Sequence, residues 1–281
     1  MPEVIAGIAP LRKRLALVRG RGASIGLVPT MGALHAGHAK LLNTARQEND
    51  MLIASVFVNP IQFDRPEDLE NYPRTMEADL RLCETSGVDL VFAPAASDLY
   101  PREQLTFVES PLLSARLCGA HRPGHFRGVA TVVLKLFNIV QPDRAYFGEK
   151  DAQQLAVIRR MVEDFNLPVT VVPVATVREE DGLALSSRNK HLTREQRTVA
   201  PVLSRALRLA ADRIERGERC VESVRSQSLA SFAPYPEARV EYFELVDPET
   251  LQPMERIDGP VLIAAAMWLG PTRLIDNVLW P

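Results

Sequence analysis

The chain has 281 residues, of which 46% are apolar and only 6% aromatic, so it can bury one large core or two modest cores built mainly from aliphatic side chains. Its formal net charge of −2 gives no general attraction to nucleic acid or to an anionic membrane. No stretch approaches the ~20 apolar residues that a membrane-spanning helix requires. The three cysteines lie far apart without metal-ligand spacing, which disfavours a zinc site or a disulfide framework: Cys83, Cys118 and Cys220.

The first 20 residues contain basic side chains that follow a short apolar stretch instead of preceding it. This order is wrong for a secretory signal peptide. Together with the cysteine usage, it predicts a cytoplasmic protein with no membrane partner.

Strand-like and helix-like segments alternate over the first two thirds of the chain. Apolar runs bounded by Gly or Pro predict buried strands, and apolar residues at helical spacing predict the helices between them. In chain order these are a strand at 23–30, a helix at 39–49, strands at 51–60 and 87–94, a helix at 128–142, a strand at 144–151, a helix at 152–167 and a strand at 168–177. The alternation predicts an α/β fold, a Rossmann-like parallel sheet with helices on both faces.

The pattern changes after about residue 190. Thr193 and Gln196 have capping-box spacing for a long helix that reaches about residue 218, and Pro201 is expected to bend it or delay its regular start. A helix at 221–232 and strands at 238–247, 260–270 and 272–280 follow. We therefore predict a Rossmann-like domain over residues 1–186 and a smaller α+β domain over residues 187–281.

Four polar clusters follow predicted strands. They are "PTMGALHAGH" at 29–38, "VNPIQF" at 58–63, "FGEKDAQQ" at 147–154 and "REEDGLALSSRN" at 178–189. In open parallel sheets, ligands bind beyond the carboxyl ends of the strands. We therefore expect all four clusters to line one crevice.

His35 and His38 lie where a strand ends and a helix begins, at backbone N–H groups that suit an anion. Gly32 permits a tight turn there, and Gly37 permits close approach of the backbone. Two imidazoles in this place are expected to donate hydrogen bonds to phosphate oxygens. The alternatives for an isolated pair are a capping histidine beside a core one, or a chance pairing. A zinc site lacks a third ligand nearby, and neither GxGxxG nor a Walker motif is present.

Two further clusters carry cations. Lys150 stands at a helix start, where it opposes the helix dipole, and a bound polyphosphate would remove that conflict. Ser186, Ser187 and Arg188 offer two hydroxyls and a guanidinium, as a mobile phosphate clamp would. The alternatives are a solvated charge cluster for the first and a polar linker for the second.

Asn59, Gln62 and Gln154 are neutral amides at strand ends or helix starts. As a group they suit a small substrate with hydroxyls and a carboxylate, because an amide can donate and accept at one place. Their alternative role is to satisfy the backbone in turns. The run "HRPGHFRG" at 121–128 is typical of a flexible basic loop, and we assign it no chemistry.

Taken together, "PTMGALHAGH", "VNPIQF", "EDLENYPRT", "RPGHFRGVATVVLKLFNIVQPDRAYFGEKDAQQL" and "DGLALSSRN" resemble the pantoate–β-alanine ligases, also called pantothenate synthetases. The resemblance is dense from about residue 26 to 192. The HxGH motif alone is shared with the wider superfamily of nucleotidyltransferases and class I aminoacyl-tRNA synthetases, whereas "YFGEKDAQQL" with "LALSSRN" is far more specific.

The resemblance implies an ATP-dependent ligase that joins (R)-pantoate to β-alanine through a pantoyl adenylate, with release of AMP and diphosphate. It implies catalytic roles for His38, His35 and Lys150. Mg²⁺ would be bound through the ATP phosphates, with no metal site on the protein. The protein would be a homodimer in which the C-terminal domain acts as a lid. Gln62, Gln154 and Asn59 would bind pantoate or β-alanine. The implied ATP-binding residues are Met31, Gly32, Ala33, Leu34, His35, Ala36, Gly37, His38, Gly148, Glu149, Lys150, Asp151, Val177, Leu185, Ser186, Ser187 and Arg188.

Three other functions compete with this one. A nucleotidyltransferase acting on a phosphorylated acceptor is disfavoured. Binding of an acceptor phosphate would favour arginine or lysine at the positions of the three amides, Asn59, Gln62 and Gln154. An RNA-binding relative of the synthetases is disfavoured by the near-neutral charge and by the absence of a basic surface rich in aromatic residues. A non-catalytic nucleotide sensor stays open as an alternative, and it would bind ATP without consuming it.

Overall fold

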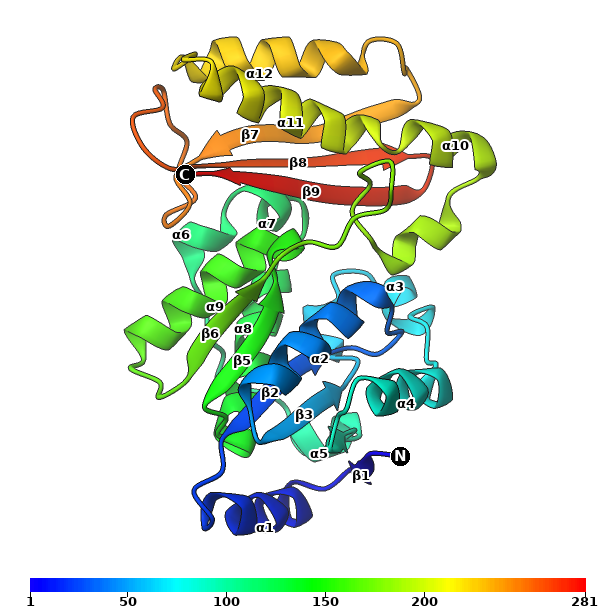
Figure 1. Cartoon of the computed structure of the whole chain (residues 1–281), viewed down its shortest axis with the longest axis vertical. Helices are drawn as coiled ribbons and strands as arrows, with labels where there is room; N and C mark the ends of the chain where they lie inside the picture. Colours follow the sequence, from blue (N-terminus) through cyan, green and yellow to red (C-terminus); the bar gives the residue numbers. More distant parts are fainter. The chain divides into compact units, whose positions relative to one another are not determined.

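The computed structural model describes all residues 1–281, which form two compact units (Figure 1). The first comprises Met1–Ser110, Arg122–Gly148 and Val157–Ala175, and the second comprises Pro111–His121, Glu149–Ala156 and Thr176–Pro281. The chain thus passes between the units several times, whereas the sequence predicts a single boundary after residue 186. Sequence patterns indicate which elements form, and the assignment of short segments to a unit depends on contacts distant in sequence.

The first unit contains a six-stranded sheet in the order β1-β4-β3-β2-β5-β6, with every pair of neighbours parallel. This confirms the predicted Rossmann-like sheet. Chain order reverses between the neighbours β2 and β5, and such switch points are where ligands bind in these sheets. The strands are β1 (Glu3–Ile5), β2 (Ile25–Thr30), β3 (Met51–Val56), β4 (Leu90–Phe92), β5 (Arg144–Gly148) and β6 (Thr170–Val174).

Helices pack on both faces of this sheet. On one face, Leu42 of α2 and Cys83 of α4 share an apolar cluster with Val28 of β2. On the other, Phe137 of α8 meets Phe147 of β5 edge-on, with ring centroids 6.4 Å apart. The helices of this unit are α1 (Ile8–Arg19), α2 (Ala36–Glu48), η1 (Pro60–Gln62), α3 (Pro66–Glu70), α4 (Met76–Thr85), α5 (Ala96–Leu99) and α8 (His125–Val140), with the later part of α9 (Ala152–Asp164).

The second unit is built on an antiparallel sheet of β7 (Ala238–Val246), β8 (Val261–Leu269) and β9 (Thr272–Trp280). The apolar face of α11 packs on it, where Ala206 and Ile214 join the cluster of Ile263. This confirms the predicted α+β architecture. The helices are α6 (Pro111–Ser114), α7 (Leu117–His121), η2 (Glu149–Asp151), η3 (Ser187–His191), α10 (Arg194–Val199), α11 (Val202–Glu215), α12 (Val221–Leu229) and η4 (Ala230–Phe232).

The predicted long helix after residue 193 is two helices. Its capping box is present: the Gln196 N–H donates to Thr193 Oγ1 over 3.3 Å, and the Thr193 N–H donates to Gln196 Oε1 over 3.0 Å. Pro201 then separates α10 from α11, since it has no N–H to continue the helical hydrogen-bond ladder. None of the helices combines the length and apolar character needed to traverse a bilayer.

Candidate active site

The loop between β2 and α2 carries the first cluster of predicted site residues. Gly32 and Ala33 adopt left-handed backbone conformations, with φ of 82° and 51°, which reverse the chain sharply after the strand. The Gly32 N–H donates to Thr30 Oγ1 over 3.2 Å, and this hydroxyl in turn donates to the Ser55 carbonyl on β3 over 2.7 Å. The turn is therefore tied to two neighbouring strands.

A buried carboxylate on α4 holds the same loop. Asp79 is only 2% exposed, and it accepts the Ala33 N–H over 3.1 Å and the Leu34 N–H over 2.8 Å. A Cβ atom at Gly32 would lie 3.0 Å from its Oδ2, so glycine suits this position by space as well as by conformation. No sequence motif points to Asp79, because it lies 45 residues from Leu34 in a helix without a motif of its own.

The two histidines share one arrangement at the start of α2. His35 caps the helix, where its Nδ1 accepts the Gly37 N–H over 3.1 Å, and His38 Nδ1 accepts the His35 N–H over 3.2 Å. The ring centroids lie 4.3 Å apart. Because each Nδ1 is an acceptor, each neutral ring carries its proton on Nε2. The helix N-terminus therefore carries two imidazole N–H donors, a combination suited to an anion.

Gly37 is required by this cap. A Cβ atom there would lie 2.8 Å from His35 Cε1, so any side chain would displace the capping ring. The predicted need for close approach at Gly37 is thus explained by an imidazole packed against the backbone.

Asn59 is completely buried, and both ends of its amide are engaged. Its Nδ2 donates to Gln62 Oε1 over 3.0 Å and to the Gly128 carbonyl over 3.1 Å, while its Oδ1 accepts the Tyr100 hydroxyl over 2.8 Å. This geometry favours a role in orienting Gln62 over direct contact with a substrate.

Gln62 connects the amide cluster to the β2–α2 loop. It is 7% exposed, and its Nε2 donates to Met31 Sδ over 2.8 Å. Since Asn59 occupies its Oε1, the donor end of the Gln62 amide is the end that lies at Met31. The structure therefore brings together Met31, Asn59 and Gln62, which come from two of the predicted clusters.

The segment 121–128, to which the sequence assigned no chemistry, includes residues that contact Gln62. His125 Nδ1 donates to the Gln62 carbonyl over 2.8 Å, and its Nε2 accepts Arg122 Nη1 over 3.2 Å. A Cβ atom at Gly128 would lie 2.4 Å from the Ile61 carbonyl oxygen, so α8 packs on η1 at backbone distance. Only a glycine allows that approach.

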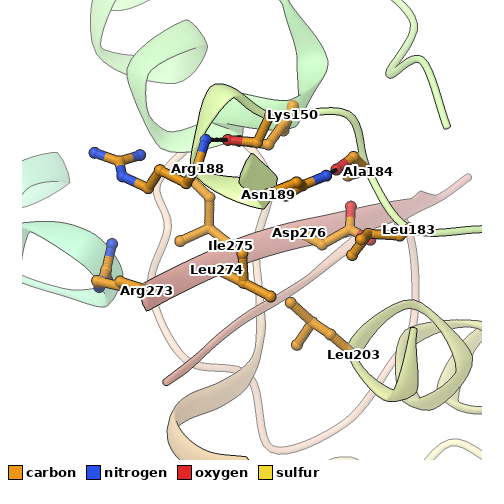
Figure 2. A pocket seen from close by; sticks show the side chains of 11 residues that line it. Lys150, Leu183, Ala184, Arg188, Asn189, Leu203, Arg273, Leu274, Ile275 and Asp276 are labelled. Carbon is orange, nitrogen blue, oxygen red and sulfur yellow. Dashed lines mark hydrogen bonds between the residues drawn. The ribbon is translucent and has the colours of Figure 1, made fainter. Parts of the chain in front are cut away.

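In the second unit, one small pocket brings together three predicted residues, Lys150, Ser186 and Arg188 (Figure 2). The Lys150 ammonium and the Arg188 guanidinium have no hydrogen bond or ion pair within the chain, so the pocket has two uncompensated positive charges. Arg273 also lines it, but its guanidinium donates to Glu241 Oε2 from Nη2 over 2.5 Å and from Nε over 2.9 Å. Two unpaired cations in one pocket are suited to an anionic ligand.

The segment 176–191 around this pocket is held by its own backbone. The Leu185 N–H donates to the Val177 carbonyl over 2.9 Å, and Arg178 forms an isolated antiparallel β-bridge with Ala184. Ser186 caps η3, since its Oγ accepts the Arg188 N–H over 3.3 Å. Val177 and Leu185, both predicted at the nucleotide, are thus direct backbone neighbours.

The remaining predicted residues are less constrained by neighbours. Gly148 ends β5, and a Cβ atom there would meet nothing within 4 Å, which leaves open space beside the backbone. Glu149 and Asp151 flank Lys150 in η2, and Gln154 lies half-buried in α9. Ser187 begins η3 between Ser186 and Arg188 but does not itself line the pocket.

The predicted residues divide between the two units. The first unit carries Met31–His38, Asn59, Gln62 and Gly148, and the second carries Glu149, Lys150, Asp151, Gln154, Val177 and Leu185–Arg188. Across the chain, no three His, Cys, Asp or Glu side chains gather in an arrangement that would hold a metal ion.

Comparison with known proteins agrees with the resemblance seen in the motifs. The sequence model described as pantoate-beta-alanine ligase matches residues 3–279. Pantothenate synthetase from Moorella thermoacetica is 55% identical over 277 residues, which cover 99% of this chain and 98% of that protein.

Solved structures show the same relationship. Pantothenate synthetase from Thermus thermophilus superposes with a TM-score of 0.91 at 48% identity, over 98% of each chain. Pantoate-beta-alanine ligase from Francisella tularensis, complexed with beta-gamma ATP and beta-alanine, superposes with a TM-score of 0.79 at 33% identity, over 99% of this chain and 98% of that one. From its matching motifs, parallel sheet and near-complete alignment, this chain belongs to the pantoate–β-alanine ligase family.

Proposed function

We propose how this chain performs the reaction of its family, the ATP-dependent condensation of (R)-pantoate with β-alanine to give pantothenate for coenzyme A biosynthesis. A carboxylate does not form an amide unaided, because oxide is a very poor leaving group. Attack of the pantoate carboxylate on the α-phosphorus of ATP gives pantoyl adenylate and diphosphate. The β-alanine amine then attacks the acyl carbon, and AMP leaves.

The histidine pair at the start of α2 carries this proposal. Adenylation needs little covalent help from the protein, but it needs positioning and donors for the charge that grows on the phosphate oxygens. Residues 31–38 would surround ATP, and the Nε2–H groups of His35 and His38 would stabilise the phosphates. His38 would in addition donate a proton, which is the role that the resemblance implies for this position. The nearby residues Met31, Gly32, Ala33, Leu34, Ala36 and Gly37 would supply backbone contacts.

The second unit would supply the remaining nucleotide contacts. Lys150 would bind the phosphates, and Leu185 through Arg188 would close over the triphosphate. Gly148 and Asp151 would contact the ribose beside Glu149, and Val177 would contact adenine. The two unpaired cations of the pocket support this assignment, because a triphosphate supplies the negative charge that they lack.

The amides would bind the acid substrate. Gln62 and Gln154 would hold the hydroxyl and carboxylate groups of pantoate, with Gln62 also near β-alanine. A donor is what a carboxylate needs, and Gln62 places its Nε2 toward Met31. Asn59, predicted to bind substrate, would act by fixing that orientation.

Mg²⁺ would be bound through the phosphates of ATP, where it would neutralise part of their charge. We further propose a cytoplasmic homodimer without nucleic-acid or membrane partners. Residues 187–281 would act as a lid, within a unit that also includes Pro111–His121 and Glu149–Ala156.

Exchange of labelled diphosphate into ATP tests the adenylate step. We expect exchange that requires pantoate and proceeds without β-alanine, since the first half-reaction is complete before the amine binds. Product analysis should then show free AMP beside pantothenate. Exchange without any carboxylic acid, or none with pantoate, would sink the adenylate mechanism, and a nucleotide-capped product would indicate a nucleotidyltransferase.

Replacing Asp79 by Asn tests the support of the ATP loop. The substitution places an amide where the Ala33 and Leu34 N–H groups need an acceptor, so the free energy of unfolding should fall by about 1–3 kcal/mol. The affinity for ATP should fall as well, because the single amide oxygen of Asn can accept only one of the two loop N–H groups and the NH₂ group faces the other. Urea denaturation and ATP titration measure the two effects.

Asp98→Asn is the matched control. Asp98 also accepts a backbone N–H, from Ala95 over 2.8 Å, but at the exposed start of α5. The Asp98→Asn substitution should leave the affinity for ATP unchanged. Equal loss of ATP affinity in both variants would refute the assigned role of Asp79.

A further inference from the structure

Two consecutive residues of β9 contact both segments that we assign to the ATP phosphates. These are Asp276 and Asn277, and the strand, η2 and the segment 178–189 all belong to the second unit. Neither residue belongs to a recognisable phosphate-binding sequence motif. Their contacts nevertheless reach the backbone of Lys150 and the base of the loop that holds Ser186 and Arg188.

Asn277 fixes the backbone of η2. Its Nδ2 donates to the Glu149 carbonyl over 2.8 Å and to the Lys150 carbonyl over 2.9 Å. An amide NH₂ has two hydrogens, so it can satisfy both carbonyls at once. The short turn from which the Lys150 side chain extends is thereby attached to β9.

Asp276 fixes the base of the segment 178–189. It is 4% exposed, and it accepts Arg178 through two bonds, from Nη1 over 2.6 Å and from Nη2 over 3.0 Å. Paired bonds of this kind fix direction as well as distance. Arg178 Nη1 also donates to the Gly182 carbonyl over 3.1 Å, so the carboxylate supports the turn that leads to Ser186.

The hydrogen bonds that hold η2 and those that hold the segment 178–189 meet at Asp276 and Asn277. Asp276 Oδ1 accepts the Asn277 N–H over 2.8 Å, and Asn277 presents its carbonyl to Arg178 Nη2 at 3.4 Å. Figure 2 shows Asp276 between the strand and the loop, in the wall of the pocket that Lys150 and Arg188 also line. A displacement of either segment would therefore change the distance between the two unpaired cations.

We infer that Asn277 and Asp276 are positioning residues, which set the spacing of Lys150 and Arg188 for the triphosphate. The inference rests on the proposed assignment of those two cations to the ATP phosphates. It predicts an effect confined to the half-reaction that uses ATP. Misplacement of a binding group by about 1 Å can lower a rate by roughly 100-fold.

Replacing Asn277 by Ala removes both donors to η2. We expect kcat/KM for ATP in pantoate-dependent diphosphate exchange to fall by about 10- to 100-fold. Aminolysis of synthetic pantoyl adenylate by β-alanine needs no triphosphate, so its rate should stay within about 2-fold of the unaltered enzyme. Asn277→Asp keeps the shape of the side chain but removes its N–H donors, and it should lose as much exchange activity as Asn277→Ala.

Asn138→Ala is the matched control, because its Nδ2 donates to the Leu134 carbonyl over 3.0 Å on the exposed side of α8. It should alter neither half-reaction. Asn277→Ser retains one hydroxyl donor, so its kcat/KM for ATP in exchange should lie between those of the native enzyme and Asn277→Asp. If Asn277→Ala does not fold, this comparison tests the positioning role instead.

The outcomes separate the inference from the function on which it rests. Loss of exchange with intact aminolysis supports the positioning role. An unchanged kcat/KM for ATP, or an equal loss in both half-reactions, overturns it. Absence of pantoate-dependent exchange in the native enzyme would overturn the adenylate mechanism itself.

Discussion

Turnover should fall by roughly two or more orders of magnitude when His38 is replaced by Ala, as it does when a transition-state donor is removed. The imidazole Nε2–H is the donor that we assign to the phosphate, and its direction is set by the bond that Nδ1 accepts from the His35 N–H. The measurement is kcat for pantothenate formation at saturating substrates. Circular dichroism confirms that the variant is folded.

The loss of a helix cap must be separated from the loss of catalysis. His38 occupies the third position of α2, where Gln commonly accepts the N-cap N–H. His38→Gln should therefore retain the thermal stability of the native enzyme and still lose most of its turnover. Asn43→Ala, at an exposed position of the same helix, should lose neither. Near-normal turnover in a folded His38→Ala variant would refute the role of this imidazole.

Lys150→Met should lower turnover by about 100-fold or more, because it removes one of the two unpaired cations of the pocket while keeping most of the aliphatic stem. The fall should appear in diphosphate exchange, where the full triphosphate is bound. Since Lys150 has no ion pair within the chain, the substitution breaks no internal contact of the ammonium. The melting temperature should therefore stay close to that of the native enzyme.

Lys190→Met is the matched control for Lys150. Lys190 is exposed in η3 of the same unit and does not line the pocket. Its loss changes the net charge equally, so it tests whether the effect arises from general attraction of ATP. A similar fall in both variants would assign Lys150 to that general attraction and not to the reacting phosphates.

Much of the fold could be predicted from sequence, because long apolar strands and amphipathic helices carry strong periodicity. The parallel sheet, the three C-terminal strands of an α+β architecture and the capping box at Thr193 are confirmed, and the structure adds that these three strands pair antiparallel. The structure adds elements too short for a periodic signal, such as β1, α3 and α5, and the helices α1 and α4. Pro201 does not bend one long helix; it lies between α10, which ends at Val199, and the long regular helix α11, which starts at Val202.

The residues that support the site were harder to predict than those that form it. Motifs identify His35, His38 and Lys150 because their chemistry is local. Asp79, Tyr100 and Asn277 act on residues 45, 41 and 127 or more positions away. A carboxylate, a hydroxyl and an amide are ordinary in any sequence, and only the folded chain shows which backbone groups they meet.

Because each unit is built from several separate segments of the chain, the enzyme cannot be divided into two domains by a single cut. A fragment that ended at residue 186 would retain Pro111–His121 and Glu149–Ala156 but lose the antiparallel sheet with which they are grouped. Asn277 would no longer reach the carbonyl of Lys150, and Arg273 would no longer reach Cys118. Truncation at that point would thus separate Lys150 from the strand whose Asn277 holds its backbone, even though the remaining fragment keeps most of the recognisable motifs.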